Sequence, residues 1–332
     1  MRLFWYISLI AIFCQSLMAQ DAQLVTVHKA MELMGSRFDI TVVASSEEIG
    51  SINIDEASAE IKRIEKLISS WDVESETSLI NLNAGLKPVK VSDELFSLIE
   101  RSIQISELSD GAFDISYASL DNIWKFDGSI KEMPSEIEVK NSIAKVGYRN
   151  IVLNEVDQTV FLSKKGMKIS FGAIGKGYAA DKAKELLISK QVVGGIINAA
   201  GDLTTWGTKA NGQKWLVGIA NPLSEERIFS WLPIVESSVA TSGNYEKHFI
   251  LNGIKYSHII DPRTGYPSTG VNSVSIFAKS AETCDALATA VYILGKDKGL
   301  DLINQLGGIE VVLIDSLSQV HKSSGILLDQ GE

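Results

Sequence analysis

Two oxygen-bearing side chains lie one helical turn apart near the C-terminal end of the sequence. Asp285 and Thr289 are four residues apart in a stretch with helical apolar spacing, so both would project from one face of a helix. A carboxylate and a hydroxyl suit Mg²⁺, which takes few protein ligands and completes its octahedron with water and substrate phosphates. In the structural alternative, the Asp interacts with the helix dipole and the Thr bonds back to the preceding turn. Spacing alone favours that alternative, so a metal site is predicted only in combination with other features.

A histidine and an aspartate lie beside a turn in the segment from Tyr256 to Pro267. His258 and Asp261 come at the end of a predicted strand, directly before Pro262. A histidine in this place could act as a base or orient a hydroxyl group. The alternative is a histidine that is hydrogen-bonded within the turn, which is the commoner role of a lone histidine.

A glycine-rich loop offers a place for phosphate groups. Residues 172–178 read Gly-Ala-Ile-Gly-Lys-Gly-Tyr between a predicted strand and a predicted helix. Glycines let a backbone approach phosphates, and the N-terminus of a helix stabilises their charge. The loop matches neither the P-loop nor the dinucleotide-binding pattern, and a tight turn that needs small residues explains it as well.

Aromatic residues lie beside these polar segments. Each could stack on a flat ring of a ligand, although packing in the core is the favoured explanation for any single one. They are Trp71, Phe113, Tyr178 and Tyr256.

Helices and short strands must position these residues. Apolar spacing predicts helices over 54–68, 93–108 with Ser92 as N-cap, 178–189 and 281–294. The same reasoning predicts strands over 36–44, 167–171, 192–199, 214–220, 255–260, 271–277, 309–314 and around 324–327. This order of elements favours an α+β fold with a central, mainly antiparallel sheet flanked by helices.

The composition is that of an ordinary globular protein. The 332 residues are 45% hydrophobic and 22% charged, enough to bury a large core. The formal net charge of −10 and the absence of any basic run argue against a nucleic-acid partner. An anionic substrate would therefore need a metal ion or backbone N–H groups.

The first residues have the layout of a secretory signal peptide. Arg2 precedes an apolar run from Leu3 to Phe13, and small residues lead to Ala19. We expect cleavage after residue 19, which leaves residues 20–332 as one domain. The alternatives are a membrane anchor, for which the run is short, and a lipoprotein that uses Cys14. After cleavage Cys284 would be the remaining cysteine, so no internal disulfide is expected.

Several segments together resemble the ApbE family of FAD:protein FMN transferases. They occur in the family's order, from Met34 to the strand after Gly308, and the stretch Ser257–Gly265 is the most specific of them. The segments are 71–83, 110–115, 172–181, 240–245, 257–267 and 284–289. The resemblance implies an ApbE-like, T-fold-related architecture.

The resemblance also implies the residues of an active site. Mg²⁺ would be held by Asp285, Thr289 and the main-chain carbonyl of Ala173. His258 would lie nearest the chemistry, supported by Asp261. The FAD site would be lined by Met34, Trp71, Ala112, Phe113, Asp114, Ser170, Lys176 and Ile260.

Two of these positions depart from the family pattern. Ser170 stands where members often carry Asp, which would alter a contact on the adenosine side. Trp71 stands where members commonly have Tyr, and where members that hydrolyse FAD can carry a small polar residue. A bulky aromatic side chain at this position favours transfer over hydrolysis.

The function implied is Mg²⁺-dependent transfer of FMN from FAD to a Thr or Ser hydroxyl, with release of AMP. The acceptor would be an exported or membrane redox protein with an Asp-x-x-Ser/Thr-Gly-Ala/Ser-Thr type motif. The enzyme itself would be exported and periplasmic or periplasm-facing, with tethering to the inner membrane as an alternative. A Mg²⁺-dependent FAD pyrophosphatase and a passive flavin-binding protein are the competing functions.

Overall fold

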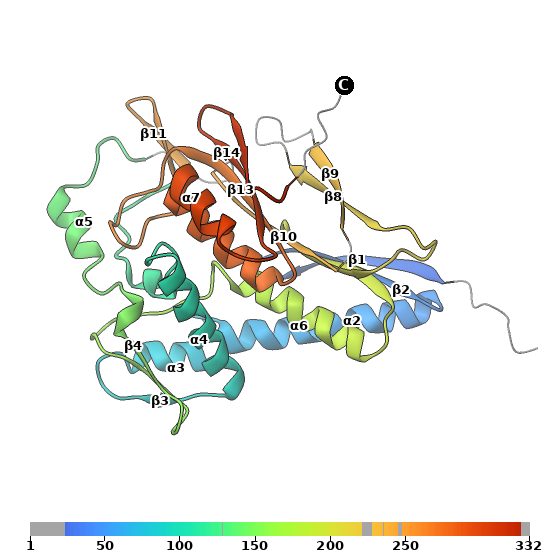
Figure 1. Cartoon of the computed structure of the whole chain (residues 1–332). Coiled ribbons are helices and arrows are strands. Elements are labelled where there is room, and N and C mark those ends of the chain that lie inside the picture. Colours follow the sequence, from blue (N-terminus) through green and yellow to red (C-terminus); the bar gives the residue numbers. More distant parts are fainter. Residues whose placement is uncertain (1–23, 128, 221–227, 235, 245–247, 327–332) are drawn as a thin grey trace, which may run out of the picture.

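The computed structural model describes residues 24–127, 129–220, 228–234, 236–244 and 248–326. An eight-stranded sheet runs through this part of the chain (Figure 1). Every pairing in this sheet is antiparallel, which confirms the predicted fold class. In spatial order its strands are β1 (Val25–Leu33), β2 (Ser36–Ala44), β6 (Gly194–Ala199), β7 (Asp202–Gly207), β10 (Ser238–Gly243), β13 (Val271–Ala278), β14 (Glu310–Asp315) and β15 (Val320–Lys322).

Short strands form three further sheets. They are the pair β8 (Trp215–Ala220) and β9 (Ile228–Ile234), the pair β11 (His248–Leu251) and β12 (Ile254–Ser257), and the triple β3 (Val89–Lys90), β5 (Thr159–Leu162) and β4 (Ile151–Asn154). The helices are α2 (Glu47–Ile68), α3 (Glu76–Leu82), α4 (Asp93–Leu108), α5 (Glu136–Ser142), α6 (Gly175–Ser189) and α7 (Ala281–Asn304), with 3₁₀ turns η1 (Ile115–Ser119) and η2 (Tyr148–Asn150).

The first hairpin follows from local sequence. Phe38, Ile40 and Val42 alternate with less buried neighbours along β2, as predicted. Met34 and Gly35 join β1 to β2 with positive φ angles of 52° and 67°. Two positive φ angles in a two-residue connection match the right-handed twist of the strands.

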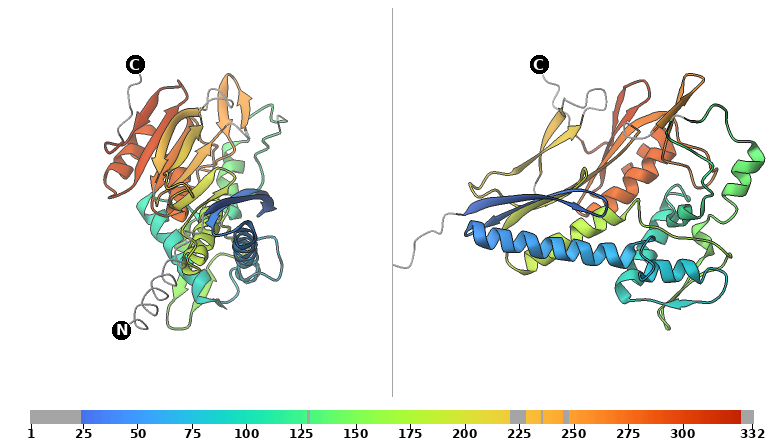
Figure 2. Two further views of the ribbon diagram at one scale, coloured as in Figure 1. Left: turned by 90° about the vertical axis from the view of Figure 1, so that its right-hand side faces the viewer. Right: turned by 180° about the vertical axis from the view of Figure 1, so that it is seen from behind.

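Three long helices form a layer against the sheet (Figure 2). α2 contacts β1 and β2, α6 contacts β6 and β7, and α7 contacts β10 and β13, while α6 lies between α2 and α7. α4 begins after the predicted cap Ser92, whose hydroxyl accepts the Leu95 N–H. Among the described residues, no helix is long and apolar enough to cross a membrane.

Two hydrophobic cores meet along α7. The first is formed mainly by α2, α4, α6, β2 and β6, and the second by β10, β13, β14 and α7. Ala286 and Ala290 of α7 belong to the first core, whereas Leu287 and Val291 belong to the second. In the sheet, β7 and β10 join the two halves over two residue pairs. We call this junction the seam.

Two predicted strands are wrong. Residues 167–171 form no strand because side chains satisfy their backbone: the Asn81 amide bonds the N–H and carbonyl of Ile169, and the Ser119 hydroxyl does the same for Lys168. The strand predicted around 324–327 lies earlier, at β15, because the chain turns at Asp315, whose carboxylate accepts the Gln319 N–H. Residue 327 lies outside the described residues.

Other element boundaries differ from the predictions. α2 begins at Glu47, since the Ser46 hydroxyl caps it, and α6 begins inside the glycine loop at Gly175. α7 runs as predicted to residue 294 and continues to Asn304 beyond Gly295, whose φ of 76° interrupts the helix. β12 ends at Ser257, three residues before the predicted end. The predicted signal peptide, residues 1–19, lies outside the described residues.

Candidate active site

A cavity of about 440 Å³ brings together segments that are far apart in the sequence. It lies beside the seam, where α6 and α7 meet β7 and β10. Of the residues predicted for the site, those that line it are Ala112, Phe113, Asp114, Ser170, Ala173, Lys176, His258, Ile260, Asp285 and Thr289. The glycine loop, the histidine turn and the Asp/Thr pair therefore share one cavity; local sequence patterns left them separate, and only the family resemblance joined them.

The first turn of α6 packs against α7 without an intervening side chain. The backbone N–H of Gly177 donates to Asp285 Oδ2 at 3.2 Å. A Cβ at Gly177 would lie 2.1 Å from the carbonyl oxygen of Ala281, so a larger residue cannot fit here without a shift of the helices. This close approach fixes the glycine loop relative to Asp285.

Three residues with oxygen donors of the kind that Mg²⁺ binds line this cavity. Asp285 is 5% exposed, Thr289 is half-buried, and Ala173, which could offer its main-chain carbonyl, lines the same space. The Thr289 hydroxyl lies 3.3 Å from that of Ser242 on β10. Among the described residues, no group of three or more His, Cys, Asp or Glu side chains could hold a metal ion. The donor set therefore fits a hard cation that keeps water or substrate oxygens, as Mg²⁺ does.

Lys176 lies between two carboxylates. Its Nζ is 2.8 Å from Asp202 Oδ2 and 3.7 Å from Asp285 Oδ2. The charge of Asp285, followed by that of Asp202, raises the pKa of the Lys176 ammonium. Burial and the charge of Asp285 raise the pKa of Asp202 to about 7, against the opposing effect of Lys176. No sequence motif indicated Asp202, since its pairing with Lys176 exists only in the fold.

The turn that carries His258 rests on an aromatic cluster. The His258 ring lies edge-on to Phe126, with centroids 6.4 Å apart. Trp124 packs on Phe249, and its indole N–H donates to the Gly265 carbonyl at 2.8 Å. These contacts hold both ends of the turn, so His258 is presented to the cavity from a rigid support.

Asp261 is directed to its own turn. Its carboxylate accepts hydrogen bonds from the backbone N–H of Arg263 at 2.9 Å and from the guanidinium at 2.8 and 2.9 Å. Asp261 is absent from the residues that line the cavity, although its neighbours Ile260 and Pro262 are among them. In this structure Arg263 holds the Asp261 carboxylate, which shapes the turn.

Asp114 faces the cavity but uses its carboxylate internally. Oδ1 accepts the N–H of Ser116 and Oδ2 that of Tyr148, each at 2.7 Å. Burial raises the pKa of this carboxyl despite the two donors. Asp114 thus ties together the loop that includes Ala112 and Phe113.

A second cavity, of about 560 Å³, adjoins the first. The two share lining residues, Tyr117, Leu120, Ser170 and Ile260. Trp71 lies at the second cavity and is 93% exposed, so its ring is open to a ligand. Met34 is not among the residues that line either cavity; it lies at the hairpin turn, with its terminal methyl 3.8 Å from the position of a Cβ on Gly175.

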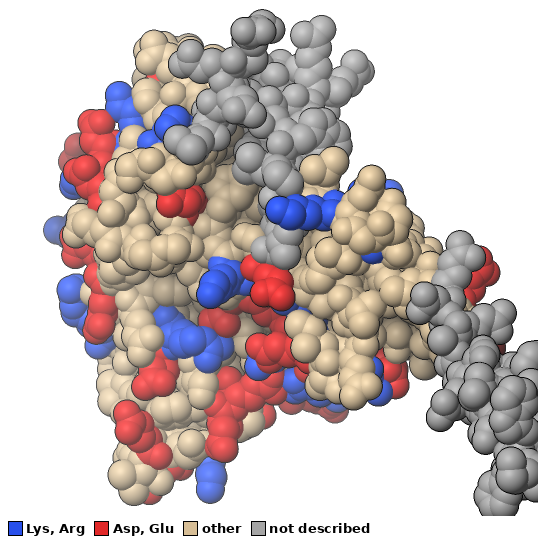
Figure 3. Space-filling model, turned by 45° about the vertical axis from the view of Figure 1, so that its right-hand side comes forward, with Lys and Arg blue, Asp and Glu red and all other residues tan. Residues whose placement is uncertain are grey.

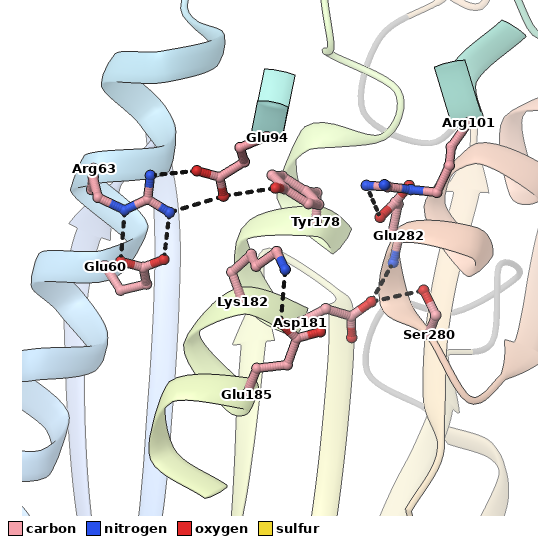
Figure 4. Close-up of polar contacts among 10 residues, drawn as sticks. All are labelled: Glu60, Arg63, Glu94, Arg101, Tyr178, Asp181, Lys182, Glu185, Ser280 and Glu282. Carbon is pink, nitrogen blue, oxygen red and sulfur yellow. Dashed lines mark hydrogen bonds and ion pairs between the residues drawn. The ribbon is translucent and has the colours of Figure 1, made fainter. Parts of the chain in front are cut away.

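The aromatic residues of the polar segments divide into two groups. Phe113 and Trp71 lie at the cavities. Tyr178 is 2% exposed and donates its hydroxyl to Glu94 at 2.8 Å (Figure 4), and Tyr256 stacks on Phe249. Core packing, the favoured alternative for a single aromatic residue, is therefore correct for the last two. It describes Phe113 as well, since Phe113 is 1% exposed and belongs to the first core.

Polar contacts behind the cavity connect the helices that carry it (Figure 4). Asp181 of α6 accepts the Ser280 hydroxyl at 2.8 Å and the Glu282 N–H at 3.0 Å, which caps the start of α7. Arg101 of α4 pairs with Glu282 at 2.6 Å. On the face drawn in Figure 3, Lys and Arg residues lie among Asp and Glu residues and form no single patch.

Comparison with known proteins agrees with this geometry. The model of the ApbE family matches residues 34–313. An FAD:protein FMN transferase of Treponema pallidum is 32% identical over 282 residues, which cover 80% of this chain and 78% of the relative. One of Klebsiella pneumoniae is 31% identical over 266 residues, which cover 80% and 82%.

Two solved structures are similar over nearly the whole chain. The ApbE protein of Thermotoga maritima has a TM-score of 0.80 at 30% identity, with 90% of this chain and 97% of that chain covered. The apo form of the flavinyl transferase ApbE of Pseudomonas stutzeri has a TM-score of 0.80 at 25% identity, with 91% and 96% covered. The sequence match and the shared fold together show that this chain belongs to the ApbE family.

Proposed function

We propose that this chain is a Mg²⁺-dependent FAD:protein FMN transferase. A hydroxyl oxygen of the acceptor attacks the FMN phosphorus, a new P–O bond forms, and the bond to the AMP phosphate breaks. FMN is then held by a phosphoester, AMP leaves, and the hydroxyl proton is given up to a base. The observation that carries the proposal is the convergence of Lys176, His258, Asp285 and Thr289 on one cavity. The activity in the names of the curated relatives supports it.

FAD would occupy the two adjoining cavities. A dinucleotide needs room for two ring systems and a pyrophosphate between them, and the shared residues Tyr117, Ser170 and Ile260 lie at the junction. The exposed ring of Trp71 lies at the second cavity, where it can contact a flat ring, whereas Phe113 borders the first cavity from the core. The pyrophosphate would face Lys176.

Mg²⁺ would be held by Asp285, Thr289 and the carbonyl of Ala173. When bound, it neutralises charge on the pyrophosphate as phosphorus is attacked. Lys176 would supply a positive charge and, to the phosphate oxygens, the N–H donors that its pair with Asp202 leaves available. His258 lies on the same cavity and would accept the proton of the acceptor hydroxyl.

The acceptor and the location complete the proposal. The acceptor would be an exported or membrane redox protein that presents Ser or Thr in an Asp-x-x-Ser/Thr-Gly-Ala/Ser-Thr type motif. The apolar run from Leu3 to Phe13 supports an exported, periplasm-facing enzyme.

The decisive experiment mixes the purified chain with FAD, Mg²⁺ and a peptide that carries an Asp-x-x-Thr-Gly-Ala-Thr sequence. Mass spectrometry of the peptide and chromatography of AMP are the measurements. We expect a peptide heavier by one FMN residue and one AMP for each modified peptide. EDTA should abolish both products.

Two other outcomes would each replace the proposal. AMP with free FMN and an unmodified peptide would make the chain an FAD pyrophosphatase, in which water takes the place of the hydroxyl. FAD binding without any product would make it a flavin-binding protein. A Thr→Val peptide serves as the control, because it keeps the shape of the acceptor and lacks the attacking oxygen.

A further inference from the structure

Asp202 occupies a place in the cavity that no sequence motif indicates. It is the first residue of β7 and is 4% exposed. The turn before it contains Ala200 and Gly201, with φ angles of 53° and 104°, which directs the strand into the seam. A buried acid therefore reaches Lys176 from the sheet, whereas Asp285 reaches it from α7.

The Asp202 carboxylate pairs with the Lys176 ammonium. Its Oδ2 lies 2.8 Å from the Lys176 Nζ, closer than the 3.7 Å to Asp285. The backbone N–H of Thr241 on β10 also donates to the Asp202 carboxylate. Because buried charges are costly unless paired, this geometry holds the ammonium on the Asp202 side.

The net charge around Lys176 determines how strongly a cation is attracted to Asp285. Two carboxylates and one ammonium carry a formal charge of −1 in total, which attracts a divalent ion. Without Asp202, the ammonium would neutralise Asp285 by itself and would compete with the ion. In a buried site such a change of one charge acts strongly over a few ångströms.

We propose that Asp202 is a positioning residue that holds the Lys176 ammonium away from Asp285 and so preserves the negative charge that a divalent cation meets there. The proposal rests on the proposed function, because it takes Asp285 and Thr289 as the cation site. It adds a residue that contacts neither the cation nor the acceptor hydroxyl and acts through Lys176.

The experiment measures the Mn²⁺ affinity of the full chain by electron paramagnetic resonance, without FAD and at pH 8. We expect Asp202→Asn to weaken Mn²⁺ binding by about tenfold or more. Lys176→Met should strengthen it, because both carboxylates then face the ion. The double variant Asp202→Asn/Lys176→Met has the formal charge of the wild type and should bind Mn²⁺ nearly as the wild type does.

Restoration in the double variant separates a positioning role from a structural one. If Asp202 only stabilised the β6–β7 turn, removal of Lys176 would not recover the affinity lost in Asp202→Asn. Asp315→Asn is the matched control, since Asp315 is 8% exposed and lies outside the residues that line the cavity. Its Mn²⁺ affinity should equal that of the wild type.

Equal affinity of Asp202→Asn and wild type would overturn the proposal and leave FMN transfer untouched. So would failure of the double variant to recover. If Asp202→Asn does not fold, Lys176→Met alone decides: tighter Mn²⁺ binding supports the proposal, and unchanged or weaker binding overturns it. A wild type that transfers FMN with no divalent cation and binds no Mn²⁺ would overturn the proposed cation site, and this inference with it.

Discussion

The backbone N–H of Gly177 donates to the Asp285 carboxylate at 3.2 Å, which joins the first turn of α6 directly to α7. The contact requires that the two helices approach with no side chain between them, since a Cβ at Gly177 would meet the Ala281 carbonyl. A glycine in a phosphate-type loop is usually explained by the ligand. Here its first role is to set the distance between the two helices that build the site.

Gly177→Ala should therefore affect stability and activity together. A methyl group here must displace α6 from α7, which costs about 1–3 kcal/mol of unfolding free energy, and FMN transfer should fall because Lys176 and Asp285 move apart. Urea denaturation and the peptide assay measure the two effects. Gly307→Ala is the control, since nothing lies within 4 Å of its Cβ position, and its stability should change by less than about 0.5 kcal/mol. An unaltered Gly177→Ala enzyme would contradict the close approach.

Asp285→Asn tests the cation site. The substitution keeps the shape of the side chain and removes its charge, so FMN transfer at fixed Mg²⁺ should fall about 100-fold or more. Titration of the rate with Mg²⁺ measures the effect. Asp301→Asn, an exposed acid on the same helix, should leave the rate unchanged. Full Mg²⁺-dependent turnover in Asp285→Asn would show that the cation binds elsewhere.

His258→Gln tests the acceptance of the hydroxyl proton. Loss of a general base lowers the rate typically 10²- to 10⁴-fold, and we expect a fall in kcat of about that size with little change in FAD affinity. Steady-state kinetics and fluorescence titration with FAD separate the two quantities. His28→Gln is the comparison, because His28 lies on β1 and pairs with Asp39. Normal kcat in His258→Gln would assign proton removal to another group.

Trp124→Phe tests the support of the His258 turn. The variant keeps a ring against Phe249 and loses the hydrogen bond to Gly265, so stability should fall by about 1 kcal/mol and FMN transfer should fall with it. Trp206→Phe is matched to it: this indole is also buried and donates to the Val192 carbonyl at 2.9 Å, away from the turn. Trp206→Phe should lose similar stability at unchanged kcat. Equal kinetics of both variants would deny that Trp124 supports the turn.

Glu94 predicts a pH dependence of stability. The hydrogen bond from Arg63 lowers the pKa of Glu94 most, burial raises it, and the hydrogen bond from Tyr178 lowers it further (Figure 4). The pKa of Glu94 therefore lies below its usual value of 4.5. A lowered pKa means that the unfolded chain binds the proton first as pH falls. The contribution of Glu94 is therefore fully present above about pH 5 and is lost as pH falls through its folded pKa.

Glu94→Gln should be less stable than wild type by roughly 1 kcal/mol at pH 7, allowing for solvent screening. The difference should shrink below pH 4, as measured by urea denaturation across pH. Glu107→Gln, an exposed acid on α4, should track the wild type at every pH. A constant gap for Glu94→Gln would mean that its charge contributes nothing.

Local patterns predicted the elements that bury one face. The strand at 36–44 and the helices at 54–68 and 93–108 have apolar residues at the period of their structure, and Ser92 marks a boundary. The strand at 167–171 was wrong because its extended, apolar sequence finds backbone partners in Asn81 and Ser119. Those side chains are 88 and 49 residues away, and no local pattern encodes such partners.

The residues of the candidate site were also predicted only in part. Family motifs named Lys176, Asp285 and His258, which the fold places on one cavity. Asp202 was not predicted, because a single acidic residue after a glycine cannot be told from an ordinary turn residue by sequence. The family resemblance implied a role for Asp261 beside His258, and the fold adds that Arg263 pairs with the Asp261 carboxylate.

We expect the structure to open first at the seam between β7 and β10 when the enzyme is heated. Lys176 and Asp202 belong to one half of the sheet and its helices, and Asp285 and Thr289 to the other. The two strands pair over two residues each, so the sheet itself joins the halves weakly, and their separation would take the Ala286 and Ala290 face of α7 out of the first core. FMN-transfer activity should then be lost some degrees below the melting temperature. A substrate that contacts both halves should bring the temperature of activity loss up to the melting temperature.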